Sequence, residues 1–171
     1  MKRNALSLVL TIALAAGVVG ASTIQNRQAA LVSEAKIKMA EARQIALGRV
    51  PGTIKEGRLH REDGKTVFEI EVHTANGEAT EVYVDAIDRG IVKVESAGKV
   101  KNRDRLTSEA RITFEQAEQA SLRRVPGTIV ESELERENGK IVYSLKIISA
   151  DGNESEVEID AVSGEVLEVE N

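Results

Sequence analysis

A five-residue stretch that occurs twice restricts what this chain of 171 residues can fold into. Val-Pro-Gly-Thr-Ile stands at residues 50–54 and again at residues 125–129, and the shift of 75 positions continues without a gap to the C-terminus. Similarity at a fixed spacing indicates that one structural unit has been duplicated. Two copies are fewer than a solenoid requires, so the sequence predicts two tandem domains.

Each copy begins with a pattern typical of an amphipathic helix. In the second copy Thr113 and Gln116 have the spacing of a capping box, whereas in the first copy Lys38 stands in place of the threonine. We therefore expect the second helix to start sharply and the first to start less sharply, nearer Ser33.

The repeated stretch itself ends each helix. Pro51 and Pro126 push the residue before them out of helical geometry. Gly52 and Gly127 follow, and glycine accepts dihedral angles that other residues avoid. These four residues have no titratable group, so we assign them a structural role in turning the chain.

Four strand-like segments follow in each copy. Asp63-Gly64 and Asn138-Gly139 are hairpin signals, because both pairs accept the positive φ that tight turns require. Between turns the apolar residues alternate, as at Phe68, Ile70 and Val72. One apolar face per strand and one amphipathic helix can cover each other. The predicted fold is α+β, with two repeats that each pack one N-terminal helix on a four-stranded antiparallel sheet.

The first residues read as an export signal. Lys2 and Arg3 precede an apolar run, and Val19 and Ala21 are small residues at the positions that a signal peptidase reads. The run is shorter than the roughly 20 residues that span a bilayer. We expect a periplasmic or extracellular protein. In the alternative the segment stays uncleaved as a membrane anchor, with the rest of the chain outside the cytoplasm.

The remaining boundaries follow from the repeat. The predicted segments are a signal peptide at 1–21, a spacer at 22–32, a first domain at 33–95, a basic linker at 96–107 and a second domain at 108–171. The second domain is the more acidic one, so the linker either lies against its sheet or forms a solvated joint.

Composition excludes several classes of function. The chain has no cysteine, which excludes disulfides, thiolate metal sites and a cysteine nucleophile. Its formal net charge of −5 and its aromatic content of 2% argue against nucleic acid as a partner. No phosphate-binding loop, dinucleotide fingerprint or Gly-x-Ser-x-Gly turn is present. We predict no cofactor and no catalytic residue, so the protein is not expected to be an enzyme.

Two groups of titratable residues could carry chemistry. His73 with Glu71 and Glu69 could form a metal patch, but alternate residues on one strand lie about 7 Å apart, too far to share an ion unaided. Asp85 and Asp160 stand beside turns, where a short carboxylate accepts backbone N–H groups. We assign both aspartates a turn-bracing role and predict no metal site.

The second copy also carries a set of carboxylates that are expected to face outward from its last two strands. They lack the spacing of a Ca²⁺ loop, so a solvated edge that resists aggregation is the favoured interpretation. The set comprises Glu156, Glu158, Asp160, Glu168 and Glu170.

The second copy resembles the PepSY domain family. The resemblance lies in the helix, the Val-Pro-Gly stretch, Gly-Lys-x-Val-Tyr at residues 139–143, and Val-x-Ile-Asp-Ala-x-x-Gly-Glu-Val at residues 157–166. The first copy departs at Phe68, which replaces the tyrosine, and at Gly90, which lies one place further along. The family is found in propeptides of secreted peptidases and in bacterial envelope proteins.

The resemblance implies a non-catalytic module that restrains peptidases. It supplies no catalytic residue to carry over, and no peptidase domain follows in this chain. We therefore expect an exported protein-binding module whose partner is an envelope or secreted peptidase. The alternative, which depends on the acidic second copy, is an envelope accessory protein that binds a cation or a small ligand. Contact with a membrane is expected only if the N-terminal segment is not cleaved.

Overall fold

The computed structural model describes residues 27–100 and 106–171. The predicted signal peptide therefore lies outside the described residues, as do part of the spacer and residues 101–105 of the linker. Residues 27–34 are helical. No helix in the described ranges is long and apolar enough to cross a membrane.

The two repeats have the same order of elements, and the predicted α+β class is confirmed. The first contains α2 (Met39–Arg49), β1 (Thr53–Glu62), β2 (Lys65–His73), β3 (Glu78–Asp85) and β4 (Ile91–Lys99). The second contains α3 (Leu106–Glu109), α4 (Phe114–Arg124), β5 (Thr128–Glu137), β6 (Lys140–Ile148), β7 (Glu154–Asp160) and β8 (Val166–Glu170).

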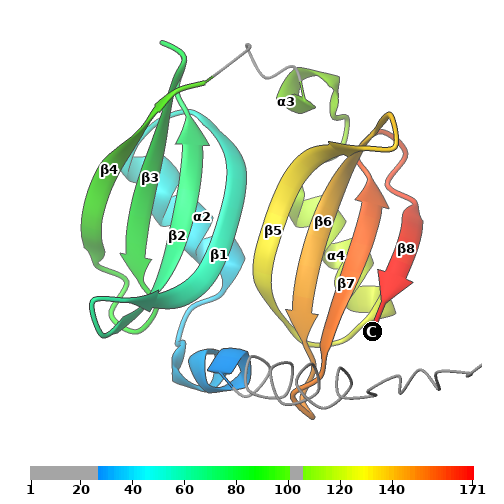
Figure 1. Ribbon diagram of the computed structural model, residues 1–171, viewed down its shortest axis with the longest axis horizontal. Coiled ribbons are helices and arrows are strands. Elements are labelled where there is room, and N and C mark those ends of the chain that lie inside the picture. The colour runs from blue at the N-terminus through cyan, green and yellow to red at the C-terminus, as the bar shows by residue number, and fades with distance from the viewer. Residues whose placement is uncertain (1–26, 101–105) are drawn as a thin grey trace, which may run out of the picture.

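The two four-stranded meanders join edge to edge into one antiparallel sheet. Its strand order is β4-β3-β2-β1-β5-β6-β7-β8, with α2 and α4 on the same face (Figure 1). The junction is short: β1 and β5 pair at three positions, with Gly57 opposite Ser132 at the centre. These two residues are 75 positions apart and thus equivalent in the repeat. The repeats are therefore related by an approximate two-fold axis through the junction.

The helices start differently, as predicted. Thr113 and Gln116 form a complete capping box at the start of α4. Lys38 precedes α2 without any side-chain cap, and α2 begins at Met39, separate from the helical residues 27–34. The start of α2 thus lies further along the chain than Ser33.

The repeated stretch brings each helix end against a strand end. A Cβ atom on Gly127 would lie 2.5 Å from the backbone oxygen of Ile148, and one on Gly52 would lie 2.5 Å from that of His73. Real Cβ atoms do not approach oxygen so closely. The glycines therefore let the chain pass over the end of the second strand of each repeat.

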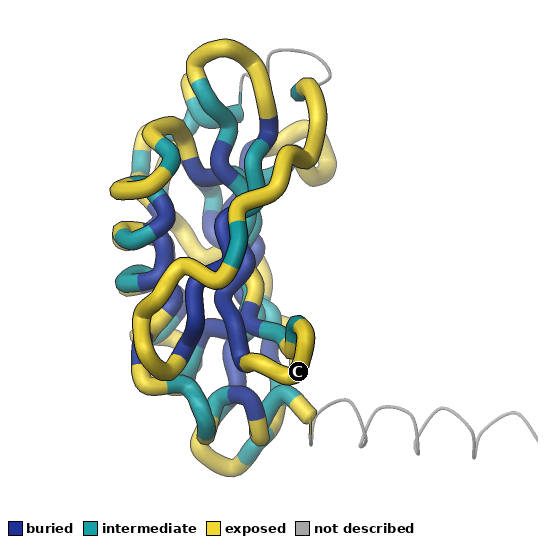
Figure 2. The backbone as a smooth tube through the Cα atoms, turned by 90° about the vertical axis from the view of Figure 1, so that its left-hand side faces the viewer, coloured by how far each residue is buried: buried dark blue, intermediate teal, exposed yellow. Residues whose placement is uncertain are grey.

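The core lies between the helices and the sheet and is almost wholly aliphatic. Seen from the β4 side, the sheet interior is buried while the outermost strand is exposed (Figure 2). The strand residues fully buried in this core include Phe68, Ile70, Val72, Val82, Val84, Leu145, Ile147, Val157 and Ile159.

The helices do not cover the two outer strands. α2 packs on β1, β2 and β3, and α4 packs on β6 and β7. Every residue of β4 except Lys93 is exposed, and Val94 remains 36% exposed although it lies opposite the buried Val82. On β8, Val166 and Leu167 are exposed by 39% and 37%. Both edges of the sheet therefore present apolar side chains and main-chain groups that pair with no strand in the described chain.

Candidate functional site

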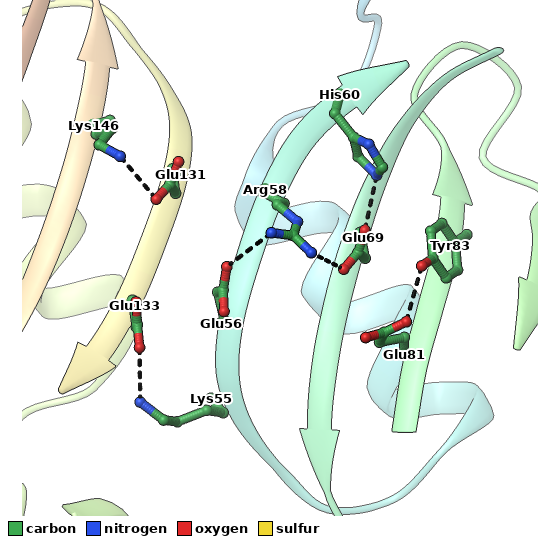
Figure 3. Close-up of polar contacts among 10 residues, drawn as sticks. All are labelled: Lys55, Glu56, Arg58, His60, Glu69, Glu81, Tyr83, Glu131, Glu133 and Lys146. Carbon is green, nitrogen blue, oxygen red and sulfur yellow. Dashed lines mark hydrogen bonds and ion pairs between the residues drawn. The ribbon is translucent and has the colours of Figure 1, made fainter. Parts of the chain in front are cut away.

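The face of the sheet turned away from α2 and α4, here called the open face, is polar along its length. Figure 3 looks onto this face near the β1–β5 junction. Side chains reach it from alternate positions of every strand, because successive residues of a strand point to opposite sides. The open face therefore carries charged side chains from both repeats.

In repeat one a buried carboxylate is paired with two basic side chains. Glu69 on β2 is only 7% exposed. Its oxygens lie 2.6 Å from a guanidinium nitrogen of Arg58 and 2.9 Å from Nε2 of His60, both on β1 (Figure 3). The hydrogen bond to Glu69 raises the pKa of Arg58. The negative charge at the centre of this face is therefore compensated from within the repeat.

Lys93 on β4 compensates a second group of acids. Its Nζ lies 2.5 Å from Glu62, 3.2 Å from Glu95 and 4.1 Å from the centre of the Tyr83 ring. Tyr83 in turn donates its hydroxyl to Glu81 (Figure 3). The hydrogen bond to Glu62 raises the pKa of Lys93, and this ion pair links β4 to the end of β1.

Lysines also bridge strands at and beside the junction of the repeats. Lys55 Nζ reaches across from β1 to Glu133 on β5 at 3.1 Å, and Lys146 on β6 lies 3.0 Å from Glu131 on β5 (Figure 3). Glu56 lies opposite Glu133, and burial followed by repulsion from Glu133 raises the pKa of Glu56. Beyond these lysine bridges, the open face of repeat two carries a cluster of acidic side chains.

Six glutamates line a hollow of about 300 Å³ over β5, β7 and β8. We call this feature the glutamate hollow. Its members are Glu135, Glu137, Glu156, Glu158, Glu168 and Glu170. No salt bridge within the described residues joins any of the six to a lysine, arginine or histidine.

The hollow occupies the same place as the compensated cluster of repeat one. The shift of 75 converts His60, Tyr83 and Lys93 into Glu135, Glu158 and Glu168. Lys93 lies opposite Tyr83 across β3 and β4, and Glu168 lies opposite Glu158 across β7 and β8. A favourable cross-strand pair in repeat one is thus a like-charged pair in repeat two, which destabilises the sheet.

Repulsion between neighbouring carboxylates contributes to raised pKa values of two glutamates in the hollow. A hydrogen bond with Glu137, followed by burial and by repulsion from Glu137, Glu168 and Glu156, raises the pKa of Glu158 to about 7. Burial, and then repulsion from Glu133 and Glu137, raises the pKa of Glu135. Glu158 thus holds a proton at a higher pH than an ordinary surface glutamate does.

The two aspartates singled out in the sequence lie at equivalent turns, outside the hollow. Asp85 Oδ1 accepts from the backbone N–H groups of Ile87 and Asp88 at 2.9 and 3.2 Å. Asp160 Oδ1 accepts from Val162 and Ser163 at 2.9 Å each. These backbone bonds lower the pKa of both aspartates.

The histidines do not assemble a metal centre in the described part of the chain. His73 Nε2 contacts Glu71 at 2.6 Å, while His60 pairs with Glu69. No group of three or more potential metal ligands converges among the described residues. Of the three residues considered as a metal patch, His73 and Glu71 are in contact, whereas Glu69 pairs with Arg58 and His60 instead.

The carboxylates of β7 and β8 are visible in the sequence, but their convergence with those of β5 is seen only in the structure. Glu135 and Glu137 on β5 complete the hollow. The signal that could have shown this was the comparison of the copies position by position, because every basic residue of the cluster in repeat one is a glutamate in repeat two. Asp160 was grouped with these residues in the sequence but bonds to its own turn.

Comparison with known proteins agrees with the duplicated architecture. The model of the family described as peptidase propeptide and YPEB domain (PepSY) matches residues 36–88 and 111–170. The uncharacterized protein YkoJ of Bacillus subtilis strain 168 is 32% identical over 146 residues, which cover 85% of this chain and 81% of YkoJ.

Two further similarities are more distant. The uncharacterized membrane protein YkoI of the same strain is 24% identical over 90% of this chain, which spans 64% of YkoI. A crystal structure of a candidate lipoprotein from Clostridium difficile 630 is 20% identical, with a TM-score of 0.47 and coverage of 80% of this chain and 93% of the other. The family match and the similarity to YkoJ together show that this chain belongs to the PepSY family and carries two copies of its domain.

Proposed function

We propose that this protein is an exported, non-catalytic module that binds an extended segment of a protein partner at an open edge of its sheet, and that the partner is a peptidase. The observation that carries the proposal is the pair of uncovered edge strands, β4 and β8. Both combine exposed apolar side chains with main-chain groups that no strand of the described chain pairs. An added strand can satisfy both.

The molecule already uses this mode of association internally. β1 and β5 are edge strands of their own repeats and pair with each other in the assembled sheet. Proteins that only need to stay soluble protect such edges with charges, short strands or coverings. Although β8 is short and acidic, both outer strands still expose apolar side chains, and this supports a binding role: Ile91, Val92 and Val94 on β4, and Val166 and Leu167 on β8.

The family supports the choice of partner and location. Its description names peptidase propeptides, which are segments that associate with a peptidase. YkoI is described as a membrane protein, and an envelope location fits the predicted export signal. A module of this kind would act by occupying the partner and would need no catalytic group of its own.

Site-directed crosslinking tests the proposal. A photoreactive phenylalanine analogue would replace Val92 on β4 or Leu167 on β8, and the control would carry it at Val162, which is exposed by 40% in the β7–β8 turn. After irradiation in envelope extract, we expect an edge position to capture a peptidase, identified by mass spectrometry. The purified protein should then slow hydrolysis by that peptidase.

Two results would contradict the proposal. One is capture of the same proteins at position 162 as at positions 92 and 167, which would show that the edges have no specific role. The other is capture at the edges of proteins that include no peptidase, which would remove the assigned partner class.

A further inference from the structure

The glutamate hollow lies beside only one of the two open edges, and this asymmetry points to a particular partner. In repeat one, basic residues of the same repeat pair with the acidic side chains at the equivalent positions. In repeat two, six carboxylates lie together. Like charges placed opposite each other on neighbouring strands lower the stability of the fold. Such a cost is expected where the charges meet an external group of opposite sign.

The equivalent positions of repeat one hold an ammonium group. Glu62 and Glu95 both contact Nζ of Lys93. Their counterparts after the shift of 75 are Glu137 and Glu170, which line the hollow. Repeat two thus keeps the two acidic positions that contact the Lys93 ammonium in repeat one. It has Glu168 where repeat one has the lysine, so the cation is missing from these positions. This observation is independent of the number of acids in the hollow.

The arrangement fits basic side chains better than a metal ion. No three ligands converge among the described residues. Glu156 and Glu158 are alternate residues of β7, and Glu168 and Glu170 are alternate residues of β8, so carboxylates within each strand stand about 7 Å apart. Basic residues at alternate positions of an extended peptide have the same spacing.

The edge of β8 places such a peptide in register with the hollow. Glu168 lies opposite Glu158 and Glu170 opposite Glu156, so both side chains are on the open face. In a strand added to β8, residues facing Glu168 and Glu170 would point to that same face. The residues between them would point to the helix side, as Val169 does opposite the buried Val157.

The edge of β4 offers no comparable site. Its register with β3 shifts at two places, which bends an edge strand, whereas the register of β8 with β7 shifts once. Its open-face lysine, Lys93, is already paired with two glutamates. A second copy of this chain is also a poor match for β8, because β4 alternates Lys93 with Val94 and then places Glu95 on the open face.

We infer that β8 is the binding edge and that it accepts an extended segment of the partner in which lysine or arginine alternates with apolar residues, the basic side chains lying over the glutamate hollow. The inference rests on the proposed function in so far as the partner is a protein. It adds the edge, the chemistry of the segment and the residues that recognise it.

Binding of a defined peptide to the purified protein tests the inference. The probe is Thr-Lys-Val-Lys-Val-Lys-Thr-amide with fluorescein on its N-terminal amine, and its binding is measured by fluorescence anisotropy at two salt concentrations. One control peptide has glutamine in place of each lysine, and a second has the same composition with the three lysines adjacent. We expect binding of the alternating peptide only, weakening as salt increases.

A matched pair of variants locates the site. Glu158→Gln with Glu168→Gln removes two charges from the hollow, and Glu78→Gln with Glu115→Gln removes two exposed charges outside it. We expect the first pair to weaken binding of the alternating peptide roughly tenfold and the second to leave it unchanged.

Several outcomes overturn the inference. Equal weakening by both variant pairs, or equal binding of the adjacent-lysine peptide, would show attraction by net charge alone. A rise in melting temperature with CaCl₂ that only Glu158→Gln with Glu168→Gln abolishes, together with no peptide binding, would make the hollow an ion site. If the peptide fails to bind but crosslinking captures a peptidase through position 92, the proposed function stands and this inference falls. Failure of both experiments removes both.

Discussion

Glu158 shows at the scale of one residue how repeat two differs from repeat one. Its counterpart Tyr83 lies under an ammonium group, whereas Glu158 faces Glu168 and shares a hydrogen bond with Glu137. One substitution at each of two facing positions thus turns an attraction into a repulsion. The raised pKa of Glu158 gives this repulsion a measurable consequence.

The pKa of Glu158 predicts a pH dependence of stability. This pKa is about 7 in the folded protein, above the ordinary value for a glutamate, so between roughly pH 4.5 and 7 the folded state binds the proton more tightly than the unfolded state. The free energy of unfolding therefore falls as pH rises through this window. We expect a lower melting temperature at pH 8 than at pH 5.5, and a smaller difference for Glu158→Gln.

The matched control for this measurement is Glu115→Gln on α4. The pKa of Glu115 is lowered, so the control variant should keep the full fall in melting temperature between pH 5.5 and pH 8. If Glu158→Gln shows the same fall as the unmodified protein, the crowding within the hollow is not what sets the pH dependence.

At the scale of elements, the two helices test how much a cap contributes. Gln116 N–H donates to the Thr113 hydroxyl, and the Thr113 N–H donates to Gln116 Oε1. α2 has no such pair, because Lys38 offers no acceptor. The chain therefore contains a capped and an uncapped version of the same helix.

Removing the cap should affect only the second helix. Thr113→Ala removes the side-chain acceptor of the Gln116 backbone N–H and should lower the free energy of unfolding by about 1 kcal/mol. Lys38→Ala, its equivalent on α2, should change the free energy by less than about 0.5 kcal/mol. Urea denaturation followed by circular dichroism measures both. Equal effects of the two substitutions would mean that the capping box does not stabilise α4.

Elements were largely predictable because their signals are local. The prolines, the Asp-Gly and Asn-Gly turns and the alternating apolar residues each act within a few positions, and Asp63 and Asn138 have the positive φ that their turns require. The pairing of β1 with β5 has no such signal. It joins residues far apart in the chain through three positions, with Gly57 and Ser132 at the centre, and neither residue type favours a strand.

The candidate site was predictable in part for the same reason. The acidic positions of β7 and β8 are visible as alternate glutamates, but their relation to β5 depends on the curvature of the folded sheet. The charge of Arg58 was equally visible, yet the burial of Glu69 beneath it was not, because a carboxylate on an open face is ordinarily solvated.

At the scale of the whole molecule, a buried ion pair lies beside the approximate two-fold axis. Arg43 on α2 and Glu118 on α4 are equivalent residues with opposite charge, 2% and 7% exposed, and their charged atoms are 2.5 Å apart. Arg43 also donates to Ser132 at 3.2 Å and lies over the ring of Phe114. Burial raises the pKa of Glu118 in spite of the neighbouring guanidinium.

Because the two equivalent residues carry opposite charges, this ion pair should favour the joining of repeat one to repeat two over the joining of two identical repeats. Arg43→Met leaves Glu118 buried without a counter-charge and should lower the free energy of unfolding by about 3–5 kcal/mol. Arg43→Met combined with Glu118→Leu removes both charges and should recover most of that loss. Urea denaturation measures the three variants against the unmodified protein.

The double variant separates two explanations. Recovery shows that the cost of the single substitution comes from the unpaired carboxylate. If the double variant is as unstable as Arg43→Met, the packing of the guanidinium on Phe114 and Ser132 provides the stability instead.

The approximate two-fold axis also determines how many partners one molecule can hold. Because β4 and β8 are equivalent strands at opposite ends of the sheet, two identical repeats would present the same docking edge twice, and each molecule could bridge two partners into a network. Lys93 neutralises one end, while Glu168 leaves the other end acidic. If β8 is the binding edge, as inferred above, the divergence of the two repeats makes each molecule monovalent, and we expect a one-to-one complex.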